Sequence, residues 1–144
     1  MNIASKLNPY LSDLVVMYLK LHDLHWNVKG KTFVQVHTYT ESRYDDMAAK
    51  FDEIAELMIM HGEAPVASMK DYLELASVKE LNKGQYSDEE VLKEVLKDTI
   101  HLKEEASEIR AELDKEDIFD AVAVLEGHIA GYAKEIWFLQ SILG

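Results

Sequence analysis

The stretch HWNVKGKTFVQVHTYTESRYDDMAAKFDEIAE, from His25 to Glu56, decides the fold of this chain. The Lys-Gly-Lys near its start predicts a turn, because glycine commonly ends a helix. A helix that ends near Val28 should therefore double back into one that begins near Phe33. His25 and His37 lie equally far from position 31, at the centre of this turn. Two antiparallel helices joined there would hold both imidazoles at about the same height, where each can offer a ring nitrogen to one metal ion.

Two carboxylates, Asp52 and Glu56, follow four residues apart near the end of the same stretch. His37 and Asp52 are separated by fifteen residues of one helical pattern, which is roughly 22 Å at 1.5 Å per residue. They cannot share a metal ion within one chain. The midpoint of His37 and Glu56 is position 46.5, and so is the midpoint of Glu41 and Asp52. A two-fold axis at that point would place the carboxylates of one chain opposite His37 and Glu41 of a second chain, twice per dimer.

Both pairings thus predict a metal site between chains. Imidazole and carboxylate ligands with an open position suit Fe(II), and zinc would also bind such a set. The chain has no cysteine, so a thiolate site and a disulfide are both excluded.

The same residues resemble a known family, the Dps-like miniferritins, which are starvation-induced DNA-binding and ferroxidase proteins of bacteria. The family motif is His-Trp-Asn, a second His twelve residues on, an acidic residue four later, and an Asp-x-x-x-Glu step. Here these positions are His25-Trp26-Asn27, His37, Glu41, Asp52 and Glu56. The resemblance extends to the closing KEIWFLQSIL, covers nearly the whole chain and is strongest to the short neutrophil-activating-protein branch. Many relatives carry Asp where this chain has Glu41.

The resemblance implies a function. His25, His37, Asp52 and Glu56 would be the catalytic residues of a ferroxidase and, with Glu41, the ligands of one or two non-haem irons. Fe(II) would be oxidised, preferably by hydrogen peroxide, and Fe(III) stored in a hollow dodecamer built from two-fold dimers, which would protect the cell against oxidative stress. In the family, the Trp at the position of Trp26 lies beside the metal site.

The remaining sequence predicts an all-α fold. Asn8 is expected to cap the first helix with Pro9 at its first position, and the second helix should run from Phe33 to Met60. An apolar stripe on the first helix has the 3.6-residue period and comprises Leu11, Leu14, Val15, Tyr18, Leu19, His22, His25 and Trp26.

A long crossover, from Pro65 to Tyr86, is expected to contain a short helix beginning beside Ser68. Ser87-Asp-Glu-Glu90 is a capping box that should open the third helix, and a further apolar stripe from Ile118 to Leu143 marks the fourth. We therefore expect residues 1–144 to form a single ferritin-like domain, a four-helix bundle with a short helix between helices two and three.

The composition limits which partners the chain can bind. The chain of 144 residues carries a net charge of −12 and has no lysine-rich tail, so we expect it not to bind DNA. No apolar run approaches the length of a membrane span and the first residues do not form a signal peptide, which favours the cytoplasm.

Two alternatives stay open: a nucleoid protein that protects DNA by binding it, for which a basic tail would be the sign, and a structural or secreted interaction protein with an incidental metal site. A single histidine is more often structural than a ligand. His22, His61, His101 and His128 are therefore interpreted as structural or surface residues. The paired Glu-x-x-His steps of full-size ferritins are missing.

Overall fold

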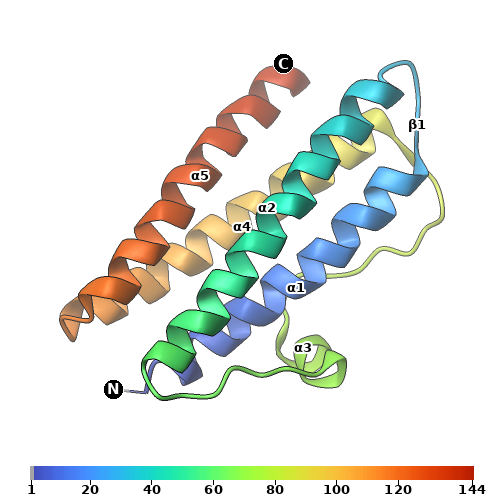
Figure 1. The fold of residues 1–144 in the computed structure, drawn as a ribbon. Coiled ribbons are helices and arrows are strands. Elements are labelled where there is room, and N and C mark those ends of the chain that lie inside the picture. The colour runs from blue at the N-terminus through green and yellow to red at the C-terminus, as the bar shows by residue number, and fades with distance from the viewer. Residues whose placement is uncertain (1) are drawn as a thin grey trace.

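The fold is a bundle of four long helices with a short helix at its side (Figure 1). The computed structural model describes residues 2–144, so residue 1 of the expected domain lies outside the described residues. The elements are α1 (Ala4–Asn27), β1 (Val28–Lys29), α2 (Phe33–Met60), α3 (Met69–Leu75), β2 (Tyr86–Ser87), α4 (Asp88–Lys115) and α5 (Phe119–Leu143). The predicted all-α bundle is confirmed. Within residues 2–144, none of the helices has the length and apolar character needed to cross a membrane.

The helices pack mainly as two pairs, α1 against α2 and α4 against α5, around a core of buried aliphatic side chains (Figure 1). A long crossover carries the chain from the end of α2 back to the opposite end of the bundle. There β1 and β2 form a short parallel pair, in which Val28 is the partner of Tyr86. This pair fixes the end of α1 beside the start of α4.

The start of α1 differs from the prediction. The helix begins at Ala4 rather than beside Pro9, which lies inside it. The Glu63 carboxylate accepts hydrogen bonds at 3.1 and 2.9 Å from two backbone N–H groups at the start of the helix, and Oδ1 of Asn2 accepts from the Ser5 N–H at 3.2 Å. Asn8 does not cap the helix; its side-chain oxygen accepts from the Val66 N–H at 3.0 Å.

The other helix boundaries follow the sequence signals. The second helix has the predicted limits. Ser68 accepts from the Asp71 N–H at 3.2 Å and opens α3. At the start of α4, Ser87 and Glu90 form both hydrogen bonds of the capping box, at 3.0 and 2.8 Å.

The predicted stripe on α1 is only partly buried. Leu11 and Leu14 lie in the core, whereas the side chains of Leu19 and Trp26 are 45% and 64% exposed. The crossover residues Glu80, Leu81 and Asn82 line a pocket together with Leu19 and Trp26 but leave both of these side chains exposed. The 3.6-residue period thus identified one face of the helix, of which only a part is buried.

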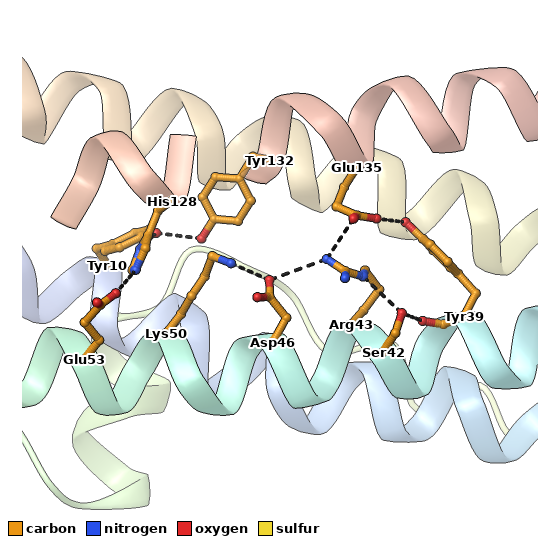
Figure 2. Close-up of polar contacts among 10 residues, drawn as sticks. All are labelled: Tyr10, Tyr39, Ser42, Arg43, Asp46, Lys50, Glu53, His128, Tyr132 and Glu135. Carbon is orange, nitrogen blue, oxygen red and sulfur yellow. Dashed lines mark hydrogen bonds and ion pairs between the residues drawn. The ribbon is translucent and has the colours of Figure 1, made fainter. Parts of the chain in front are cut away.

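A network of polar side chains lies between α2 and α5 (Figure 2). Its members are Tyr10, Tyr39, Ser42, Arg43, Asp46, Lys50, Glu53, His128, Tyr132 and Glu135. At one end the Tyr39 hydroxyl donates to Glu135 at 2.6 Å, and Arg43 lies 3.4 Å from the same residue. In the middle Lys50 pairs with Asp46. These contacts set the position of α5 relative to α2.

His128 occupies the other end of this network and is buried. Its Nε2 lies 2.7 Å from Glu53 and its Nδ1 2.8 Å from the Tyr10 hydroxyl, which in turn lies 2.6 Å from the Tyr132 hydroxyl. A neutral ring that donates from Nε2 to the carboxylate can accept from Tyr10 at Nδ1. Burial lowers the pKa of His128 against the opposing effect of Glu53.

This arrangement predicts a pH dependence of stability. Because folding holds the pKa of His128 below the unfolded value of about 6.5, the unfolded chain binds more protons as the pH falls through that value, and the free energy of unfolding decreases. His128→Gln, which cannot titrate, should weaken this dependence. Urea denaturation from about pH 7.5 to pH 5 would measure the effect. Parallel stability curves for the variant and the original protein would contradict it.

Candidate metal centre

The structure brings two of the predicted ligands together. His25 near the end of α1 and His37 near the start of α2 stack face to face, with ring centroids 3.6 Å apart and an angle of 14° between the planes. Phe33 stacks on the outer face of His37 at 5.0 Å, and the Tyr44 ring lies edge-on to His25 at 5.2 Å. The two imidazoles are thus held by packing as well as by the turn.

Hydrogen bonds fix which ring nitrogen of each histidine carries a hydrogen. Nδ1 of His25 lies 2.6 Å from the backbone carbonyl oxygen of His37, and Nδ1 of His37 lies 2.9 Å from that of His25. A carbonyl oxygen only accepts, so each Nδ1 must carry the hydrogen. In the neutral form of each ring, Nε2 then keeps a free lone pair, which is the form of histidine that binds a metal ion.

The surroundings of His25 keep it uncharged. The residue is buried, and its pKa is lowered mainly by burial and further by the neighbouring His37, although the hydrogen bond to the backbone acts in the opposite direction. The Thr40 hydroxyl lies 3.1 Å from Nδ1 of His25 and itself donates to the Val36 carbonyl at 2.9 Å. A neutral imidazole in a fixed orientation needs little rearrangement to bind a cation.

The predicted carboxylates remain separate from the histidines in the single chain. Glu41 is exposed one turn beyond His37. Its negative charge favours the protonated form of His25 and so opposes part of the lowering of the His25 pKa by burial. Asp52 and Glu56 are also exposed but lie further along α2, which is unbroken. In the described part of the chain neither of them forms an ion pair or side-chain hydrogen bond. The helix rise of 1.5 Å per residue still separates His37 from Asp52 by roughly 22 Å.

Gly30 shapes the turn between the two histidines. Its backbone φ is +148°, and a Cβ atom there would lie 2.7 Å from the Asp88 carboxylate. That carboxylate accepts from the Thr32 hydroxyl at 2.7 Å. The first residue of α4 therefore holds the turn, and only glycine allows this close approach.

A second group of potential ligands was missed by the sequence analysis. Asp13, His101 and Glu105 place ligand atoms within 4.8 Å of one another, which no other set of three such residues does in residues 2–144. His101 had been interpreted as structural or surface. Its spacing of four residues from Glu105 is visible in the sequence, but the third member lies on a different helix.

Comparison with known proteins identifies the family. Residues 4–144 match the family described as ferritin-like domain. The DNA protection during starvation protein of Helicobacter pylori is 34% identical over 132 residues, which are 92% of this chain and 92% of that protein. The crystal structure of a Dps protein from Bacillus brevis has a TM-score of 0.95 at 33% identity, over 99% of this chain and 95% of that one. This chain belongs to the Dps-like miniferritins.

The miniferritin fold is shared with further solved proteins. The crystal structure of Helicobacter cinaedi CAIP has a TM-score of 0.96 at 31% identity and covers 99% of both chains. The crossover with its short helix is thus part of a ferritin-like bundle, as the sequence predicted.

The turn yields a prediction for this miniferritin. Gly30→Ala should destabilise the protein by about 1–3 kcal/mol, because the new methyl group meets Asp88 and the backbone conformation is strained. Gly62→Ala is the matched control, since Gly62 also has a positive φ of +74° but open space around it. Chemical denaturation should show the larger loss for Gly30→Ala. Equal losses would mean that Asp88 does not constrain the turn.

Proposed function

We propose that this miniferritin is a ferroxidase that oxidises Fe(II) at sites shared between two chains and stores the Fe(III) in a hollow dodecamer. The observation that carries the proposal is the histidine pair, in which both Nδ1 atoms are bound to backbone carbonyls and both Nε2 atoms are left for a metal ion. Asp52 and Glu56 of a second chain would complete the site across a two-fold axis near position 46.5.

The ligand types fit iron as the substrate. His25 and His37 would bind Fe(II), and the carboxylates of Asp52 and Glu56 would favour the higher charge of Fe(III). Glu41 would be a further ligand, and one or two irons would occupy each site. Two Fe(II) ions give up two electrons, and one hydrogen peroxide molecule takes up both with two protons and leaves as two water molecules. Preference for this oxidant would remove iron and peroxide together, and reduction of each peroxide by two Fe(II) ions would avoid the release of a hydroxyl radical. Zinc would compete for the same ligands.

The exposed apolar edge of α1 supports association of chains. Leu19 and Trp26 lie on it, and large apolar side chains of this kind mark surfaces that contact other proteins. The ring of Trp26 also lies 5.4 Å from that of His22, near the candidate site. We propose that this edge contributes to the two-fold dimer, that residues 1–144 form one ferritin-like domain and that the assembly works in the cytoplasm.

Protection against oxidative stress would then be chemical rather than physical. Relatives are named for DNA protection during starvation, which leaves a DNA-binding function as the alternative. The net charge of −12 opposes contact with a phosphate backbone. We propose that the protein shields DNA by consuming Fe(II) and peroxide, without binding it.

The first test is iron oxidation. The purified protein should oxidise Fe(II) faster with peroxide than with oxygen, and the His25→Ala, His37→Ala double variant should lose the rapid reaction while remaining folded and assembled. His61→Ala is the control for the loss of a histidine, because this residue pairs with Asp120 and is not one of the proposed ligands. Absorbance of Fe(III) after mixing would follow the reaction. Unchanged rates in the double variant would exclude these residues as the site.

The second test addresses the division of the site between chains. One variant lacks both histidines, and another carries Asp52→Ala and Glu56→Ala; each alone should be inactive. Co-assembled from unfolded chains in equal amounts, random pairing makes half of the dimers mixed, and each mixed dimer has one complete site of two. About a quarter of the original site number should therefore return. If mass spectrometry shows mixed dimers but no activity returns, the ligands do not come from two chains.

A further inference from the structure

The interface between α1 and α4 contains two layers of buried charge. In the first, the Lys20 amino group lies 2.6 Å from Asp98 and 2.8 Å from Glu94, and the side chain of Lys20 is fully buried. One positive group is thus surrounded by carboxylates. A buried charge of either sign requires such a partner, because its removal from water is costly.

The second layer lies two helical turns away. Asp13 precedes Lys20 by seven residues on α1, and Glu105 follows Asp98 by seven on α4. Because the helices are antiparallel, the two layers have equivalent geometry. Here, however, a carboxylate faces a carboxylate. Within residues 2–144 neither of them forms an ion pair with a lysine or arginine, and their ion-pair contacts are with His101 alone.

The spacing of the three side chains matches a metal site. Nε2 of His101 lies 3.3 Å from Oδ2 of Asp13 and 4.0 Å from Oε2 of Glu105. Ligand bonds of about 2.0–2.2 Å in a tetrahedral site separate ligand atoms by roughly 3.3–3.6 Å. Only a small contraction is needed to surround an ion.

One buried atom of this group lacks a donor. No N–H or hydroxyl group of the described chain donates to Oε1 of Glu105, and the Glu105 carboxyl group contacts that of Asp13, although buried polar atoms are normally satisfied. Asp13 is completely buried, and its Oδ1 accepts from the backbone N–H groups of Ser77 and Val78 at 2.6 and 2.8 Å. Its Oδ2 accepts from the Ser77 hydroxyl at 2.7 Å and faces His101. Nε2 of His101 lies 2.7 Å from the same hydroxyl oxygen, so a bound ion would replace this contact.

We propose that Asp13, His101 and Glu105 bind one divalent first-row transition-metal ion, with zinc as the representative, and that this ion fastens α1 to α4 and to the crossover. One imidazole and two carboxylates are a donor set that such ions accept, with a fourth position left for water. The His101 side chain is 40% exposed, which gives an ion access from solvent. The site is separate from the histidine pair of α1 and α2, and the proposal does not depend on ferroxidase activity.

Crystals of the full-length protein soaked in Zn(II) would test the proposal directly. Anomalous scattering at the zinc edge should give a peak between the three side chains. Glu105→Gln should abolish the peak without unfolding the protein, because glutamine keeps the shape of the side chain and removes only the carboxylate ligand. His101→Ala, at a half-exposed position, is the second variant. A peak that is absent from the original protein, or that persists in both variants, would overturn the proposal.

Thermal unfolding with and without Zn(II) gives an independent measurement. The metal should raise the unfolding temperature of the original protein and of Glu108→Gln, which removes an exposed carboxylate from the next turn of α4. It should stabilise Glu105→Gln and His101→Ala much less, with zinc affinity reduced at least about tenfold. The same loss of zinc stabilisation on Glu105→Gln and on His101→Ala should appear in a protein in which His25 and His37 are also replaced by Ala. That background separates this outcome from the outcome of the ferroxidase tests. Equal stabilisation of all variants would place the zinc elsewhere.

Discussion

The unbroken length of α2 is the constraint on which the candidate chemistry depends. A continuous helix from Phe33 to Met60 cannot fold its ends together, so ligands at His37 and Asp52 stay roughly 22 Å apart. Any ion that uses both must lie between copies of the chain. In the single chain the histidines are already oriented and packed, whereas the carboxylates are exposed and unpaired within residues 2–144. On the proposed function, the rigidity of α2 would connect the chemistry of this miniferritin to its assembly.

The interior of the bundle is not uniformly apolar. Between α2 and α5, tyrosine hydroxyls, lysine, arginine and carboxylates satisfy one another (Figure 2). Between α1 and α4, Lys20 is balanced by carboxylates. Such networks stabilise a fold less than well-packed aliphatic side chains of the same volume would, but they tolerate few alternative arrangements. Aliphatic packing supplies the driving force for the four helices, and the polar groups select one alignment of the helices among several.

Features governed by neighbouring residues were predictable from the sequence. The limits of α2, the Ser68 cap and the capping box at Ser87 depend on contacts within a few residues, and all were confirmed. The start of α1 was mispredicted; its first N–H groups bond to Glu63, sixty residues from Ile3, and to the neighbouring Asn2. The exposure of Trp26 did not follow from the sequence, because periodicity defines a face of a helix without saying what covers it.

The candidate sites also differ in whether neighbouring residues or distant ones bring their ligands together. The alignment of His25 with His37 follows from a turn between adjacent helices, so sequence spacing was enough to predict it. Asp13 meets Glu105 only because α1 and α4 pack in one particular register, which is set by the crossover and by core contacts along both helices. Nothing in the spacing of the residues encodes that register.

The parallel pairing of Val28 with Tyr86 has a consequence for how the protein folds. The α1–α2 hairpin joins neighbouring segments and can form early, but this pair closes a loop of more than fifty residues, and such contacts form slowly because the chain between them must first be ordered. Because Asp88 follows this pair directly and holds the turn beside the histidines, we expect the turn to acquire its final shape only in that step. A partly folded chain would then lack the finished imidazole pair, and on the proposed function iron would bind only to chains whose folding is complete.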